Sequence, residues 1–138
     1  LRYQKAADNA NVLAWWLAKQ KKLDRVIYPG LKSHPQYDIA VKQQRTPNGD
    51  VIFGNMISFD ISSIKARDRF INKLEIFTLA ESLGGVESLV CAPYNMTHAA
   101  VPEKIKLDMG ITETLVRLSI GIEDIDDLKT DLKNALAN

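Results

Sequence analysis

The sequence has little of several residue types that define whole classes of function. It contains one cysteine, Cys91, so an internal disulfide is excluded, and its two histidines, His34 and His98, lie far apart. No His-x-x-x-His or Cys-x-x-Cys pair accompanies them, so the spacing gives no support to a metal site. We therefore expect no metal ion. With no charged-then-apolar leader at the start, we expect a cytoplasmic setting.

Long apolar runs and an excess of one charge are also missing. The longest apolar run, residues 12–18, is far shorter than the roughly 20 residues that a membrane-spanning helix needs. Lys and Arg number 18 against 17 Asp and Glu, a net charge of +1. Without a cluster of cations the chain lacks the electrostatic footprint of a nucleic-acid binder. We expect a soluble protein with neither a membrane nor a nucleic acid as partner.

What is present is the composition and periodicity of one α/β domain. The chain has 138 residues, 46% of them hydrophobic, which is enough for one core. Apolar spacing predicts helices over about 3–22, 63–73 and 122–136, a short helix begun by a Ser33–Gln36 capping box, and strands over 25–28, 55–61, 76–78, 89–91 and 115–120. Residues 92–114 read as loops. The expected fold is an α/β (α+β) sandwich with four or five strands and helices mainly on one face.

Arg117 is the side chain with the clearest chemical potential. Alternation along its strand puts Val116, Leu118 and Ile120 on one face and Arg117 on the other. The planar guanidinium matches a carboxylate, so a strand-held arginine suits the anchoring of an amino acid or organic acid. The alternative is a structural ion pair with Asp60 or a neighbouring glutamate.

Three other features are read as mainly structural. Ser82 stands between Glu81 and the pair Gly84–Gly85, where a sharp bend presents its hydroxyl and N–H, but no His and Asp accompany it as in a hydrolase. The glycine pair also lacks the remaining residues of a phosphate-binding loop. Cys91 lies in an apolar strand and is expected to be buried and inert.

The adjacent Trp15 and Trp16 raise a separate interpretation. Neighbours on a helix point about 100° apart, so we expect one ring in the core and the other exposed or covered by another surface. Tryptophan is enriched at interfaces. A protein-interaction domain is therefore one alternative function.

Several sequence blocks, taken in order, are informative together. They are residues 26–31 with 33–36, 56–59, 77–89, 96–99 and 118–124. They resemble the C-terminal domain of the cystathionine γ-synthase/γ-lyase family, the pyridoxal-phosphate (PLP) enzymes of Cys and Met metabolism. The resemblance covers essentially the whole chain. It implies the small C-terminal domain of a fold type I, aminotransferase-like PLP-dependent transferase, with residues 1–22 as a long interdomain helix and 23–138 as the small domain.

The resemblance also implies roles for individual residues. Ser82 and Arg117 match the positions that hold the substrate's α-carboxylate, in agreement with the position of Arg117 on its strand. Glu81 matches a position near the substrate's distal end and favours cystathionine-type substrates. Leu83, Thr97 and His98 are expected to support the site. The implied substrate is cystathionine or a homoserine derivative.

By the same resemblance, the Schiff-base lysine, the phosphate-binding residues and the aromatic that stacks on the cofactor belong to a preceding large domain that is absent from this chain. We therefore expect no catalytic or PLP-binding residue here, with PLP in the parent enzyme and none on this fragment. Because Leu1 begins inside an expected helix without Met, we expect a cut within the helix that joins the domains. The implied partners are the large domain and other subunits of a homo-oligomer, a tetramer in the parent.

These inferences lead to an ordered set of functions. The first is part of a cystathionine γ-lyase, which converts cystathionine and water by γ-elimination to cysteine, 2-oxobutanoate and ammonia. The alternative is a cystathionine γ-synthase, which replaces the acyl group of an O-acylhomoserine by cysteine. A further alternative is a stand-alone amino-acid-binding α/β module without catalysis.

Overall fold

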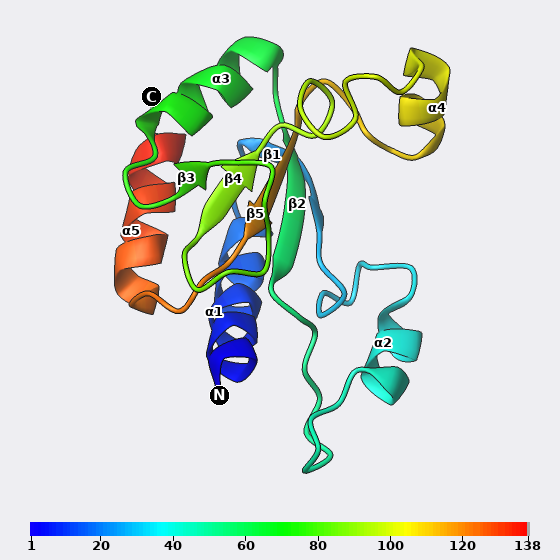
Figure 1. Ribbon diagram of the computed structural model, residues 1–138, viewed down its shortest axis with the longest axis vertical. Helices are drawn as coiled ribbons and strands as arrows, with labels where there is room; N and C mark the ends of the chain where they lie inside the picture. Colours follow the sequence, from blue (N-terminus) through cyan, green and yellow to red (C-terminus); the bar gives the residue numbers. More distant parts are fainter. Residues whose placement is uncertain (138) are drawn as a thin grey trace.

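The fold is an alternation of helices and strands over residues 1–137, the part of the chain that the computed structural model describes (Figure 1). The elements are α1 (Arg2–Leu17), β1 (Leu23–Ile27), α2 (Tyr37–Gln43), β2 (Met56–Ile61), α3 (Ile64–Lys73), β3 (Thr78–Leu79), β4 (Leu89–Cys91), α4 (Glu103–Asp108), β5 (Leu115–Ser119) and α5 (Ile125–Leu136).

The strands form one mixed sheet in the order β1-β2-β5-β4-β3. Only β3 and β4 pair in parallel; the other neighbouring strands are antiparallel. Strand β5 is central, and its register aligns Arg117 with Ser58 on one side and Cys91 on the other. Arg117 therefore lies in the middle of the sheet.

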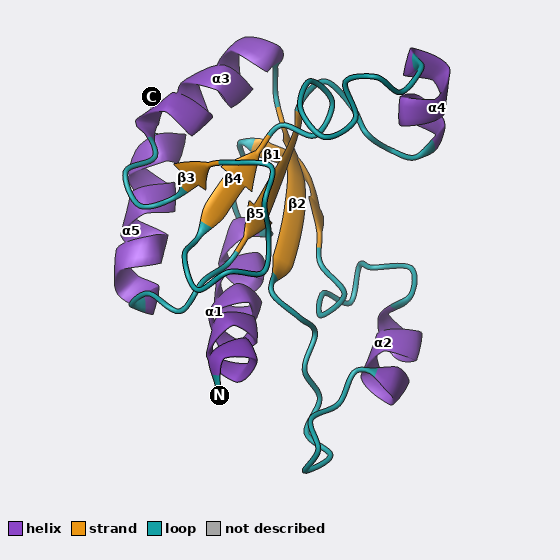
Figure 2. Ribbon diagram, viewed as in Figure 1, coloured by secondary structure: helices purple, strands orange, loops and turns teal. Residues whose placement is uncertain are grey.

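Helices α1, α3 and α5 cover one face of the sheet (Figure 2). Alternate strand residues meet them, including Ile57, Phe59, Val116 and Leu118, all fully buried. The rings of Phe59 and Phe70 pack edge to face at 5.5 Å. Burial of this apolar surface is the main force that holds the helices on this face. The opposite face, which carries Arg117, is left to loops.

Most of the expected elements are confirmed, as is the α/β class with helices mainly on one face. The alternation in β2 buries Ile57, Phe59 and Ile61 as expected. Ser63 caps α3 by accepting a hydrogen bond from the backbone N–H of Ala66 at 3.1 Å. In α5 the carboxylate of Asp124 accepts from the first-turn backbone, and Lys133 lies in the last turn, in accord with the helix dipole.

Three local expectations were wrong. Helix α1 ends at Leu17 rather than near Lys22, because the chain turns there to enter β1 and the Gln20 side chain donates to the carbonyl of Trp16. The Ser33–Gln36 capping box does not form, since the backbone N–H of Gln36 donates to His34 Nδ1 and α2 begins after Gln36. Helix α4 lies in the stretch that was read as loops.

The tryptophan pair divides as expected. Trp16 is partly buried and packs on the core, whereas 43% of Trp15 is exposed. Among the described residues, no helix has the length and apolar character needed to cross a membrane.

Candidate functional site

Arg117 lies on the face of the sheet that α1, α3 and α5 do not cover. Its strand neighbours Val116 and Leu118 are fully buried on the helix side, while Arg117 itself is partly exposed. This confirms the orientation that the alternation predicted. The guanidinium is thus carried by the central strand and opens toward solvent.

Two backbone carbonyls hold one end of this guanidinium. Its Nη2 donates to the carbonyl oxygen of Glu81 at 2.9 Å and to that of Ser82 at 3.4 Å. Within residues 1–137, Nε and Nη1 of Arg117 donate no hydrogen bond, and no carboxylate forms an ion pair with it. Three N–H donors and a full positive charge therefore remain for a ligand.

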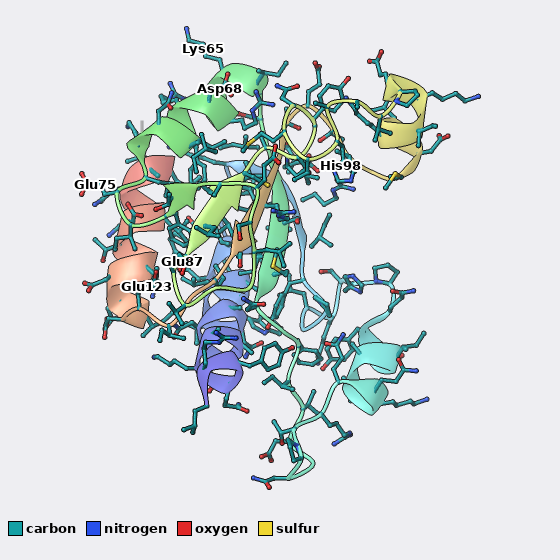
Figure 3. The ribbon with its side chains drawn as sticks, in the orientation of Figure 1. Lys65, Asp68, Glu75, Glu87, His98 and Glu123 are labelled. Carbon is teal, nitrogen blue, oxygen red and sulfur yellow. The ribbon has the colours of Figure 1, made fainter. Side chains whose placement is uncertain are left out.

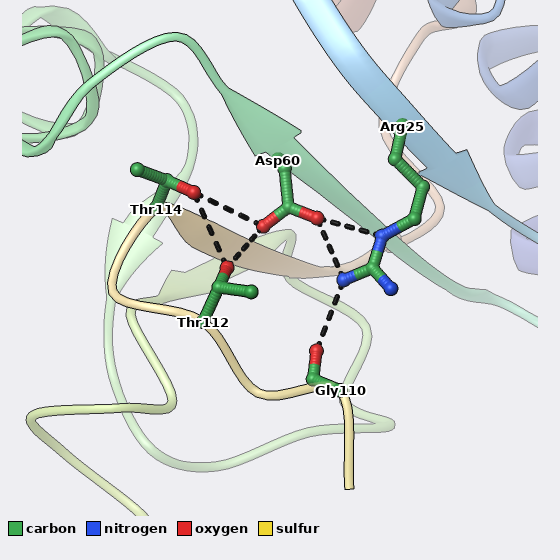
Figure 4. A network of polar contacts seen from close by, with 5 residues as sticks. All are labelled: Arg25, Asp60, Gly110, Thr112 and Thr114. Atoms are coloured by element: carbon green, nitrogen blue, oxygen red, sulfur yellow. Dashed lines mark hydrogen bonds and ion pairs between the residues drawn. The ribbon is translucent and has the colours of Figure 1, made fainter. Parts of the chain in front are cut away.

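The alternative role of Arg117, an ion pair with Asp60, is wrong. Asp60 is paired with Arg25 at 2.6 Å, and its other oxygen accepts from the hydroxyls of Thr112 and Thr114 (Figure 4). Arg25 also donates to the carbonyl of Gly110. This network ties β1 and β2 to the segment before β5, and it satisfies Asp60 without Arg117.

The loop between β3 and β4 carries the three neighbours expected at the site. Glu81, Ser82 and Leu83 are all exposed. The expected bend is present, because Gly84 has a φ of +73°, in the left-handed region that glycine adopts at little cost. The backbone N–H of Gly84 donates to the hydroxyl of Ser119, which is buried on the same face as Arg117. The loop thus folds back over β5.

The far end of this loop is held by a cluster that the sequence analysis missed. The Glu123 carboxylate accepts from the backbone N–H of Ser88 at 2.6 Å and from its hydroxyl at 2.8 Å. The same hydroxyl accepts from the N–H of Gly121, whose carbonyl accepts from the buried Asn9. Figure 3 shows Glu123 just before α5, beside Glu87 of the loop. Residues 117 and 119 face outward from β5, and the same alternation places 121 and 123 on that side. This pattern in the sequence could have revealed the cluster.

Thr97 and His98, the other expected supporting residues, lie on a different loop, between β4 and α4. The Thr97 hydroxyl and His98 Nδ1 are 2.7 Å apart, and the His98 backbone N–H donates to Pro93. The buried Lys106 braces this loop by donating to the carbonyls of Tyr94 and Ala99. Within the described chain no hydrogen bond joins Thr97 or His98 to Arg117, and the hydrogen bonds of these two residues stabilise their own loop.

Cys91 is fully buried beside Arg117 in the sheet register, as expected. Burial raises the pKa of its thiol, the Arg117 charge lowers it, and the Glu81 charge raises it. The net rise keeps the thiol neutral near pH 7, in the less nucleophilic form. Over residues 1–137 no group of three His, Cys, Asp or Glu side chains is arranged to hold a metal ion.

A family profile described as "Cys/Met metabolism PLP-dependent enzyme" matches residues 1–137. The chain belongs to this family. Cystathionine beta-lyase of Lactococcus lactis subsp. cremoris is 46% identical over 136 residues, and cystathionine gamma-lyase of Saccharomyces cerevisiae is 47% identical over 138. Each alignment covers 99% of this chain and 34% of the relative. The chain thus spans about a third of the length of these family members.

The fold agrees with that of a solved family structure. Cystathionine gamma synthase from Xanthomonas oryzae pv. oryzae, in complex with aminoacrylate and cysteine, superposes with a TM-score of 0.91 at 41% identity. The match covers 98% of this chain and 34% of the solved one. The similarity therefore extends over the whole described architecture, including the face that carries Arg117.

The family depends on PLP, a cofactor whose aldehyde forms a Schiff base with a lysine. The strands of the open face, β2, β4 and β5, contain no lysine that could bind the cofactor covalently. We therefore assign these three strands no covalent bond to the cofactor.

Proposed function

We propose that this chain anchors the α-carboxylate of an amino-acid substrate in a PLP-dependent transsulfuration enzyme. The observation that carries the proposal is the guanidinium of Arg117, which is partly buried, fixed at one nitrogen by two carbonyls and unpaired with any carboxylate of the described chain. A bound carboxylate would supply the missing counter-charge and accept from the remaining N–H donors.

The neighbouring residues suit the rest of such a substrate. Ser82 is exposed and its backbone carbonyl accepts from Arg117, and its hydroxyl would donate to the same carboxylate. Glu81 is exposed next to it, and its negative charge would attract the distal ammonium group of a cystathionine-type substrate. Leu83, Thr97 and His98 would support these loops. Fixing the carboxylate positions the remaining bonds for reaction.

The reaction we place first is that of a cystathionine γ-lyase, with cystathionine γ-synthase as the alternative. PLP would act as the electron sink for either reaction. The relatives carry three names, including cystathionine beta-lyase, which the sequence analysis did not consider. Their identities of 46%, 47% and 41% are too similar to separate these activities.

The remaining parts of the enzyme are also proposals. We propose that residues 1–22 join a large PLP-binding domain to a small domain of residues 23–138, and that the enzyme is a homotetramer in the cytoplasm. The 34% coverage of the relatives supports a longer parent protein. The catalytic lysine would then lie in the large domain, and the fragment alone would be inactive.

To test the proposal, the complete reading frame that encodes this chain is expressed. The purified protein is then given cystathionine, or an O-acylhomoserine with cysteine. Formation of 2-oxobutanoate identifies a γ-lyase, formation of cystathionine a γ-synthase, and formation of pyruvate a β-lyase. We expect Arg117→Ala to weaken substrate binding by about 2–5 kcal/mol, because a desolvated charge pair is lost. The matched control is Arg69→Ala, an exposed arginine on α3 across the sheet.

A KM unchanged in Arg117→Ala would overturn the anchoring role. If the reading frame encodes no more than this chain, and the protein binds amino acids without turnover, the result would instead support the stand-alone binding module. Binding of a protein, with a shift in the fluorescence of the exposed Trp15 and no response to amino acids, would support the interaction domain.

A further inference from the structure

The outward side of β5 and its continuation contact the 80–88 loop at successive alternate positions. Arg117 donates to the loop carbonyls of Glu81 and Ser82, and Ser119 accepts from Gly84. The next two outward positions, 121 and 123, both engage Ser88. The loop is therefore attached at both ends to one row of residues, with the carboxylate-binding positions at one end and Glu123 at the other.

Glu123 forms the most strongly bonded contact of this row. Its two carboxylate oxygens accept from the two donors of Ser88, and Ser88 is fully buried. The Ser88 hydroxyl in turn accepts from the N–H of Gly121, so the three groups form a directed chain that ends on the carboxylate. Hydrogen bonds to an ionised acceptor are stronger than neutral ones, and chains of them reinforce one another.

The backbone of Glu123 is itself fixed from the helix side. The buried amide of Asn9 on α1 donates to the carbonyls of Gly121 and Glu123, at 3.1 and 2.9 Å. The N–H of Ile122 donates to the carbonyl of Val86 on the loop. The junction between β5 and α5 is thus a rigid support that joins α1 to the loop.

We propose that Glu123 is a positioning residue for substrate binding. By holding Ser88, it fixes the 80–88 loop so that the carbonyls of Glu81 and Ser82 orient the Arg117 guanidinium and present the Ser82 hydroxyl. This inference rests on the proposed carboxylate-anchoring function for its effect on the reaction. The hold of Glu123 on the loop is a separate, directly measurable property.

The substitution Glu123→Gln tests this hold with little change in size. A glutamine has one acceptor oxygen and one NH₂ donor, whereas Ser88 presents two donors to Glu123. The hydrogen bond from the Ser88 hydroxyl to an ionised oxygen is lost, and the bond from the Ser88 backbone N–H becomes neutral. The matched control is Glu87→Gln, because Glu87 is exposed on the same loop and accepts no hydrogen bond within the described residues.

The first experiment is hydrogen exchange by mass spectrometry on the full protein of the reading frame, without substrate. We expect peptides covering 80–88 to exchange about tenfold faster or more in Glu123→Gln, with β2 unchanged, and no difference in Glu87→Gln. Unchanged exchange of the loop would overturn the proposal. If Glu123→Gln does not fold, Ser88→Ala, which keeps the backbone N–H contact, takes its place with the same expectation.

The second experiment separates positioning from general destabilisation. We expect Glu123→Gln to raise KM for the amino-acid substrate while kcat stays within about twofold, since a misplaced loop weakens binding of the carboxylate. A variant that only lost folded protein would lower kcat and leave KM unchanged, which would overturn the positioning role. If Arg117→Ala leaves KM unchanged, the proposed function fails, and the exchange result still decides the hold of Glu123 on the loop.

Discussion

Gly121 and Val86 approach each other so closely that a β-carbon on Gly121 would stand 2.2 Å from the carbonyl oxygen of Val86. That β-carbon would also lie 2.5 Å from Glu123 Oε2. The residue at 121 is therefore restricted by space rather than by backbone angle, because its φ is not in the left-handed region. This close approach brings the loop backbone near enough for Ser88 to form its hydrogen bonds with Gly121 and Glu123.

Gly121→Ala should push the 80–88 loop away from the β5–α5 junction. We expect a loss of about 1–3 kcal/mol in the free energy of unfolding, as in other overpacked sites, with faster hydrogen exchange in the loop. Urea denaturation and hydrogen exchange measure both effects. Gly49→Ala is the comparison, because its β-carbon would meet open space and only its φ of +90° is unfavourable. Unchanged hydrogen exchange in the 80–88 loop of Gly121→Ala would refute the argument that position 121 is restricted by space.

Asn9→Ala should weaken the same junction from the helix side. The substitution leaves the carbonyls of Gly121 and Glu123 without their donor in a buried setting, which costs about 1–3 kcal/mol of unfolding free energy. Gln4→Ala is the control, since Gln4 is exposed on the same helix and its side chain, within residues 1–137, donates a hydrogen bond only to Asp8 one turn away. Equal stability losses in the two variants, measured by urea denaturation, would contradict this role of Asn9.

Much of the fold could be predicted because it follows from local patterns. Alternation in β2 and β5 identified their buried faces, and the three-to-four spacing in α5 identified its apolar stripe. Errors arose where a particular side-chain contact or a change of chain direction, rather than periodicity, decides the outcome. The end of α1 is one case, because the chain must turn into β1, and the His34 ring that replaces the Ser33 cap is another.

The candidate site, like the fold, could be predicted from the sequence only in part. The direction of Arg117 follows from strand alternation, and the bend at Gly84 follows from glycine. The partners of Arg117 and Glu123 could not be derived, because they lie about 35 residues away and meet only through the crossing of the 80–88 loop over β5. The ion pair of Asp60 with Arg25 is equally non-local, because the two residues lie 35 positions apart in the sequence.

Asp131 provides a test of how α5 is attached to the chain before β3. Its buried carboxylate accepts from the backbone N–H groups of Glu75, Ile76 and Phe77 at 2.9–3.3 Å. Asp131→Ala should lower the free energy of unfolding by about 2–3 kcal/mol, because charge-assisted bonds are lost and buried donors are left unpaired. Asp127→Ala, an exposed first-turn position of the same helix, should cost clearly less in urea denaturation.

Cys91 predicts how stability changes at alkaline pH. Burial raises the pKa of its thiol in the folded protein above its ordinary value, so the folded state keeps a proton that the unfolded state releases. The stability linked to this group is therefore complete below the unfolded pKa and is lost as pH rises through the folded pKa. Cys91→Ala removes the titrating group and should flatten the decline above about pH 8.5 by up to about 1.4 kcal/mol per pH unit. Urea denaturation at a series of pH values measures the two slopes, and parallel slopes would show that Cys91 ionises equally in both states.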